Sequence, residues 1–184
     1  MGDIKKLKKK FTKPGHPWQK LRIEEEKKVL LEFGLKNKRE LWKTSSKMKN
    51  FADQAKKLIA ARGKQAEVEK KQLISKLNRL GLVSPDADLD DVLGLSLKDY
   101  LGRRLQTVLV RKGIARSLKQ SRQFITHEQI IMGHKKITSP SYLVDTKEEP
   151  LLTFDSNSAL ANPDHPERTA VQAAPKKESE AKKE

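Results

Sequence analysis

The sequence predicts an α+β protein. A basic helical N-terminal region is expected to precede a small module of two helices packed on a short antiparallel sheet, and a disordered C-terminal tail is expected to follow. Three observations support this class. Apolar residues recur at helical spacing in several stretches up to Ile125, the spacing changes to two after His127, and Ala, Pro, Lys, Glu and Ser dominate from about Asn157 onward.

The first half of the chain is expected to begin extended and to continue as helices. Residues 1–17 are rich in lysine and contain Pro14 and Pro17, which predicts a basic extended arm. In the region 18–97 the apolar spacing predicts three helices, with a glycine after or near the end of each. They are expected over residues 21–33, about 37–61 and about 66–80. The acidic connector at 82–97 should contain a short helix over 89–93.

The region 98–156 is expected to be a compact module. Ser96 and Asp99 resemble a cap for one helix that continues to Lys112, and Ser117 with Gln120 resembles a capping box for a second. Past His127, alternating apolar residues predict short strands. The first is expected at 130–132, and a tight turn over 133–136 should connect it to a second strand. Further strands are expected at 142–144 and at 151–154. The polar segment 157–184 is expected to be a flexible tail.

Charge points to a polyanionic partner. The chain carries 40 Lys and Arg against 24 Asp and Glu, a formal charge of +16. Residues 1–81 have a net charge of +15, 82–97 of −4, 98–142 of +8 and 143–184 of −3, counted from the sequence. Nucleic acid is the leading candidate for two such basic blocks, because each cation placed at a phosphate releases a counterion. The unpaired N–H groups at helix starts should favour phosphate as well.

Several other functions are disfavoured by what the sequence lacks. It contains no cysteine, no phosphate-binding loop and no dinucleotide fingerprint, so neither a cofactor nor a thiolate metal site is expected. The alternating aspartates from Asp86 to Asp91 lack the glycine and glutamate of a calcium loop. No apolar run is long enough to span a membrane, and no strongly apolar helix face accompanies the charge, so no membrane partner is expected.

The strongest signal is a resemblance to a known family. Residues 103–117 (RRLQTVLVRKGIARS), 120–127 (QSRQFITH) and 137–144 (ITSPSYLV) resemble the RNA-binding module of small-subunit ribosomal protein four, a universal family. Upstream, residues 33–42 (FGLKNKRELW) and the preceding helix are similar to its archaeal and eukaryotic branch. Pseudouridine synthases, some tRNA ligases and a heat-shock protein share the module alone. The similarity of the upstream half is therefore what limits the match to the ribosomal protein family.

The resemblance implies a structural constituent of the small ribosomal subunit, bound to the ribosome in the cytoplasm. As partners it implies a junction in the 5′ domain of small-subunit rRNA, neighbouring small-subunit proteins, and mRNA near its entrance. The expected roles are early assembly and translational accuracy, with no catalysis. The RNA-binding positions expected in this chain are Lys38, Arg39, Trp42, Arg103, Arg104, Arg111, Lys112, Arg116, Lys119, Arg122, Lys135 and Lys136.

Three positions depart from the family pattern, and one alternative function stays open. Glu128 replaces a frequent Gly, Met132 a frequent Asn, and Ser121 a common Ala. Glu128 should weaken RNA contact at the end of its helix, and Met132-Gly133 should form a poorer hairpin turn than Asn-Gly. The alternative is a non-ribosomal RNA-binding protein, either an RNA chaperone or a ribosome-rescue factor, that uses the same module.

Overall fold

The computed structural model describes residue 9, residues 11–162 and residues 165–168. The chain divides into two compact units, Met1–Leu101 and Gly102–Glu184, and each is described by itself. Most of the basic arm expected at 1–17 and most of the tail expected at 157–184 lie outside the described residues.

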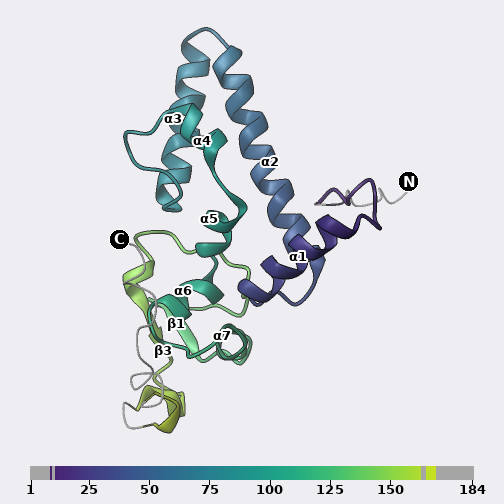
Figure 1. The fold of residues 1–184 in the computed structure, drawn as a ribbon. Helices are drawn as coiled ribbons and strands as arrows, with labels where there is room; N and C mark the ends of the chain where they lie inside the picture. The colour runs from purple at the N-terminus through teal and green to yellow at the C-terminus, as the bar shows by residue number, and fades with distance from the viewer. Residues whose placement is uncertain (1–8, 10, 163–164, 169–184) are drawn as a thin grey trace, which may run out of the picture. The chain divides into compact units, whose positions relative to one another are not determined.

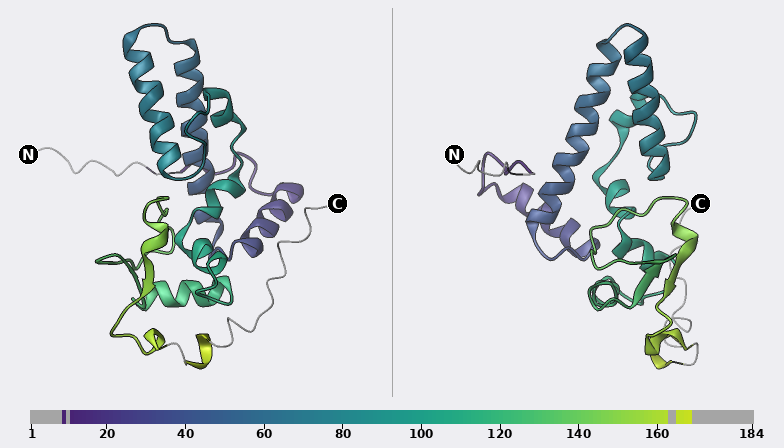
Figure 2. Two further views of the ribbon diagram at one scale, coloured as in Figure 1. Left: turned by 90° about the vertical axis from the view of Figure 1, so that its left-hand side faces the viewer. Right: turned by 180° about the vertical axis from the view of Figure 1, so that it is seen from behind.

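The first unit is helical. Its elements are α1 (Lys20–Glu32), α2 (Lys38–Ala60), α3 (Lys64–Arg79), α4 (Leu89–Gly94) and α5 (Leu97–Gly102). Figure 1 shows α2 and α3 as an antiparallel hairpin, and both views in Figure 2 show the same arrangement. Helix α2 also packs against α1 and α4. The three long helices predicted from the apolar spacing are therefore confirmed, with ends within about two residues of those expected.

Two apolar clusters stabilise this unit. One joins the hairpin to the connector and contains Ala55, Leu73, Leu77, Leu89 and Val92. The other is formed around Leu35, Leu41 and Leu101. Asp88 and Asp91 form a capping box at the start of α4, so these two acids begin a helix, as expected.

The second unit packs two short helices on a small antiparallel sheet. The helices are α6 (Leu105–Arg111) and α7 (Leu118–Thr126). Within the described residues the sheet has three strands in the order β2-β1-β3, formed by β1 (Ile130–Met132), β2 (Lys135–Lys136) and β3 (Leu152–Phe154). A 3-10 helix, η1 (Glu149–Leu151), precedes β3. Buried side chains from both helices and from β1 and β3 form one core, so the expected α+β class is confirmed.

The prediction of a single helix from residue 97 to Lys112 is wrong. The structure has two helices there, α5 and α6, which are separated by an extended turn at Arg103 and Arg104. There the chain forms a bridge in which Arg104 pairs with Leu143. Leu105 N–H donates to the Tyr142 carbonyl at 2.8 Å and Val144 N–H to the Arg103 carbonyl at 3.0 Å. These bonds to a distant segment interrupt a helix that the local apolar spacing favours.

The strands also differ in detail from the expectation. Residues 142–144 form only that isolated bridge, because they pair with the turn before α6 instead of with the sheet. Lys135 and Lys136 are a strand, not part of the turn. Met132 pairs with Lys135, so the two turn residues are Gly133 and His134. Gly133 has a φ of 60°, which fits the glycine-first II′ turn, and Met132 is not a turn residue.

Packing in the second unit continues past residue 156, where the flexible tail was expected to begin. The 3-10 helix η2 (Ala159–Ala161) places Leu160 in the core. Arg168 donates to the Ala161 carbonyl at 2.8 Å, and its guanidinium lies over the Phe154 ring. Leu160 is the apolar residue that ties this part of an otherwise polar segment to the module.

Four helices end in the same hydrogen-bonding pattern. After α1, α3 and α6 the residue with positive φ is Gly34, Gly81 or Gly113. After α7 it is Glu128, with a φ of 60°, the one such non-glycine among the described residues. Glu128 N–H donates to the Ile125 carbonyl and Gln129 N–H to the Phe124 carbonyl, which is the Schellman arrangement. A Gly at this position, which the family resemblance implies, would therefore have a backbone reason that is independent of RNA.

We predict that Glu128→Gly raises the free energy of unfolding by about 0.5–1 kcal/mol. A left-handed conformation costs a residue with a Cβ about 1–2 kcal/mol, and the greater freedom of unfolded glycine offsets part of this gain. Urea denaturation followed by circular dichroism measures the change. Glu128→Ala is the matched control, because it removes the charge and keeps the Cβ. Equal stability of the Gly and Ala variants would contradict the backbone explanation.

Candidate nucleic-acid interface

Two buried polar side chains fix α6 against α7. The Gln106 side chain donates to the Leu118 carbonyl at 2.8 Å, and the Ser121 hydroxyl donates to the Gln106 carbonyl at 2.8 Å. Their side chains are 1% and 0% exposed. Because buried polar groups need partners, these bonds specify how the two helices meet. Ser121, at a position where the resemblance implied an alanine, thus has a structural role in this chain.

The start of α7 sets which side chains face outward. Ser117 caps the helix by accepting from Gln120 N–H at 3.2 Å, and the Gln120 side chain accepts from Arg116 N–H at 2.7 Å. Arg116 precedes the cap, Lys119 lies on the side of α7 opposite the buried Ser121, Phe124 and Ile125, and Arg122 flanks that buried side. Arg116 and Lys119 are exposed, and Arg122 is half-buried. Of the donors at this helix start, the Gln120 N–H already has a side-chain partner, and phosphate binding by the other N–H groups stays a prediction.

The end of α6 adds two more cations. Arg111 and Lys112 are exposed, and both donate to neutral backbone carbonyls, those of Gly102 and Glu149 respectively. These bonds orient the side chains without neutralising them. We define the module cations as Arg111, Lys112, Arg116, Lys119 and Arg122.

Arg103 and Arg104 were expected to lie off the apolar stripe, where they could meet phosphate, and the structure places them differently. The Arg103 guanidinium forms an ion pair with Glu149 at 2.8 Å and donates to the Val144 carbonyl at 2.9 Å. Arg104 is buried, with 3% of its surface exposed. Both therefore contribute to packing, because they lie at the turn that pairs with the 142–144 segment. RNA contact by either stays a prediction.

In β2, Lys135 is exposed and Lys136 forms an ion pair with Asp155. The hydrogen bond with Asp155 raises the pKa of Lys136, and the same bond lowers the pKa of Asp155. Lys136 is thus already partnered within the chain. Within the part of the chain that the structure describes, Lys135 forms no ion pair with a carboxylate.

In the first unit the expected contact residues surround a buried carboxylate, Glu26. It accepts from Trp42 Nε1 at 3.0 Å and forms ion pairs with Arg22 at 3.0 Å and Lys38 at 3.0 Å. Trp42 also stacks on Phe11, with ring centroids 6.2 Å apart. Lys38 and Trp42 therefore join α1 to α2, and Arg39 is the exposed member of the expected trio. Burial raises the pKa of Glu26, but the bonds from Trp42 and Lys38 and the nearby cations outweigh it, so the pKa is lowered.

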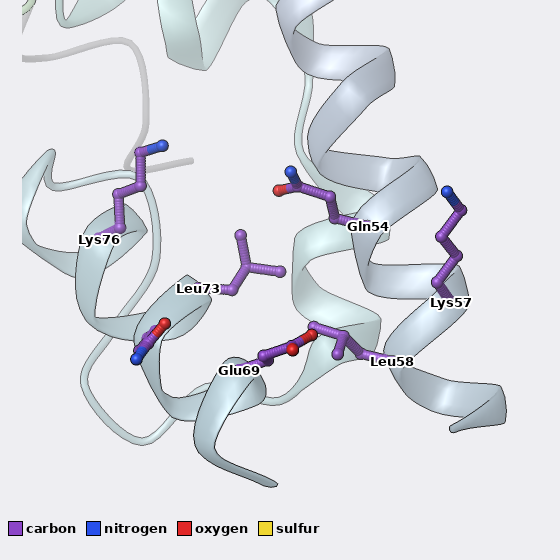
Figure 3. A pocket seen from close by; sticks show the side chains of 7 residues that line it. Gln54, Lys57, Leu58, Glu69, Leu73 and Lys76 are labelled. Carbon is purple, nitrogen blue, oxygen red and sulfur yellow. The ribbon is translucent and has the colours of Figure 1, made fainter. Parts of the chain in front are cut away.

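A hollow between α2 and α3 was not predicted from the sequence. It has a volume of about 300 Å³, and Figure 3 shows Leu73 between the two helices with polar side chains around it. The lining is formed by Gln54, Lys57, Leu58, Glu69, Gln72, Leu73 and Lys76. Lys76 also lies over the Phe51 ring, at 5.5 Å from its centroid. The spacing of apolar residues predicts which faces of the two helices pack together, but it does not predict where a cavity remains between them.

The described residues lack two features on which other functions would depend. No group of three or more His, Asp or Glu side chains there is arranged to hold a metal ion. None of the helices in that part of the chain is both long and apolar enough to cross a membrane.

Comparison with known proteins matches residues 103–149 to the S4 domain. Over 170 residues the chain is 47% identical to small ribosomal subunit protein uS4 of Methanococcus aeolicus, covering 92% of this chain and 96% of that protein. It is 47% identical to the same protein of Nanoarchaeum equitans over 166 residues, or 89% and 92% of the two chains. For Thermoplasma acidophilum the identity is 40% over 185 residues, covering 99% and 93%.

The chain belongs to the uS4 family. The resemblance inferred from the sequence is thereby confirmed, including its archaeal type. The S4 domain match covers α6, α7, β1 and β2 of the second unit, whereas β3 and Leu160 lie beyond its end. The uS4 relatives align over the helical unit as well, where Glu26 and the α2–α3 hairpin lie.

We predict that Glu26→Gln lowers the free energy of unfolding by about 2 kcal/mol near neutral pH, because it weakens bonds from charged donors. The folded pKa is lowered from an ordinary value of 4.5. The carboxylate's contribution is therefore fully present above that value and is lost as the pH falls through the lowered folded pKa. The stability difference between wild type and variant should shrink below about pH 4.5.

Urea denaturation at a series of pH values measures this difference. Glu25→Gln is the matched control, since Glu25 is the exposed neighbour on α1 and its substitution should have little effect. A Glu26→Gln deficit that stays constant from about pH 6 to pH 3 would contradict the assigned role of the carboxylate.

Proposed function

We propose that this chain is a structural constituent of the small ribosomal subunit and that it binds small-subunit rRNA. The observation that carries the proposal is the extent of the family identity, which includes the helical unit as well as the module. A shared module alone would leave the choice among several RNA-binding classes open. Relatives whose names place them in the small subunit align with 89–99% of this chain.

The electrostatics of the second unit support RNA as the ligand. Four of the module cations, Arg111, Lys112, Arg116 and Lys119, are exposed, whereas Arg103 and Lys136 of the same unit form ion pairs with carboxylates. Arginine can take a phosphate through two hydrogen bonds or stack on an unpaired base. The module cations thus form the surface that we assign to rRNA, with Lys135 at the nearby strand as an additional contact.

The finer assignments follow from the same proposal. The rRNA site is a junction in the 5′ domain, and binding occurs early in assembly. The partners are neighbouring small-subunit proteins and mRNA near its entrance, where the chain contributes to translational accuracy. The chain acts on the ribosome in the cytoplasm, without catalysis and without a membrane.

We predict that Arg116→Glu combined with Lys119→Glu weakens binding to a 5′-domain rRNA transcript by at least about tenfold at physiological salt. Two lost phosphate contacts should also reduce the slope of log affinity against log salt by about 1.4–1.8. Both side chains are exposed, so the fold should be unchanged. Filter binding at several salt concentrations, with circular dichroism of each variant, measures both quantities.

Lys147→Glu, an exposed charge reversal in the same unit outside the module cations, is the matched control. An unchanged slope in the double variant would overturn the assigned surface. Co-sedimentation tests the wider proposal: the chain should remain with the small subunit at high salt. A chain found free of subunits under those conditions would favour a chaperone or rescue factor.

A further inference from the structure

The segment before α1 is held in place at both of its ends. At one end, Phe11 stacks on Trp42, and Thr12 N–H donates to the Ser46 hydroxyl at 3.0 Å. At the other end, the Arg22 guanidinium donates to the His16 carbonyl at 2.6 Å and to the Pro17 carbonyl at 3.0 Å. The segment is therefore fixed on α1 and α2 although it contributes little to the core.

This anchored segment presents a tryptophan to solvent. Trp18 follows the two carbonyls that Arg22 holds, and 90% of its surface is exposed. The other tryptophan, Trp42, is packed between Phe11 and Glu26. An indole exposed to this degree adds almost nothing to the stability of the described fold. Its position, set by Arg22, is that of a rigid aromatic surface with few torsions to restrict on binding.

The charge around Trp18 selects the kind of partner. From residue 4 to residue 23 the sequence contains eight Lys and Arg and no Asp or Glu. Lys13 and Lys20 are exposed close to Trp18 in the chain. Lys20 pairs with Glu24 at 4.0 Å, but both side chains are exposed, and such a surface pair contributes little and is readily exchanged for a phosphate. An exposed aromatic ring in an acid-free basic segment matches the combination that binds single-stranded nucleic acid: stacking for the base and cations for the phosphates.

We propose that Trp18 is a stacking site for an unpaired base of the RNA that this chain binds. The inference rests on the proposed function and adds a second contact region in the first unit, separate from the module cations. Lys13 and Lys20 supply charge for the flanking phosphates. An acidic protein surface is the competing occupant, but it offers a π-face to the indole only where it carries an aromatic or arginine side chain, whereas every unpaired base offers one.

The test compares substitutions of Trp18 in the full chain, with a 5′-domain rRNA transcript as the probe. Trp18→Leu should weaken binding about tenfold, because it removes the ring and keeps an apolar side chain. Trp18→Phe should restore most of the affinity. Leu21→Ala, at a neighbouring site that is 70% exposed, is the control and should bind as the wild type does.

Tryptophan fluorescence supplies a direct readout of stacking. The transcript should quench the emission of the wild type more than that of Trp18→Leu, and the difference is the contribution of Trp18. A fully paired RNA duplex should not produce this difference, because its bases are already stacked. Thermal unfolding should be the same for wild type and Trp18→Leu, since the side chain is exposed.

The outcomes separate this inference from the proposed function. If the wild type binds the transcript and Arg116→Glu with Lys119→Glu binds weakly, but Trp18→Leu matches the wild type in affinity and quenching, the stacking site alone is overturned. A Trp18→Leu defect that appears only when other small-subunit proteins are added would assign Trp18 to a protein contact, and would also overturn it. Failure of the wild type to bind the transcript would overturn both proposals.

Discussion

Like charges repel where two segments of a strongly basic chain pack together, and at two such contacts the structure places a carboxylate. Glu26 accepts from Trp42 and pairs with Arg22 and Lys38, which joins α1 to α2. In the second unit, Glu149 pairs with Arg103 at the turn before α6. Removal of one partner costs more at a partly buried contact than at the surface, because it leaves the other charge desolvated and unpaired. With 24 acids against 40 bases, the chain keeps a formal charge of +16 even if every acid pairs with a cation.

This use of carboxylates divides the cations into two groups. Arg22, Lys38, Arg103 and Lys136 have carboxylate partners and connect parts of the fold. Arg111 and Lys112 donate to backbone carbonyls, which orient them but leave their charge uncompensated. Binding of a phosphate to a cation of the second group should be more favourable, because no ion pair within the protein has to be broken. The net charge alone indicates how strongly the chain attracts a polyanion. The ion pairs show which cations are available to bind phosphate.

Sequence reasoning succeeded where structure is local and failed where it depends on distant segments. The long helices were predictable because apolar spacing and glycines such as Gly34 and Gly81 are contained within each stretch. The break before α6 was not, because it depends on Arg104 pairing with Leu143, and the local spacing favours a continuous helix. The same limit explains the site residues: the partner of Arg103, Glu149, lies 46 positions along the chain. Residue type identified candidate cations, and only the fold shows which of them are engaged.

The way α7 begins also decides how the module can bind RNA. A helix start with free N–H groups would hold a phosphate through its backbone, and substitution of side chains would then matter little. In this chain Ser117 accepts from Gln120 N–H, and the Gln120 side chain accepts from Arg116 N–H. The Gln120 N–H at the helix start is thereby occupied, and the exposed cations Arg116 and Lys119 supply side-chain contacts for phosphate. Binding should therefore depend steeply on salt and on the sign of these side chains, since each phosphate contact formed by a cation releases a counterion.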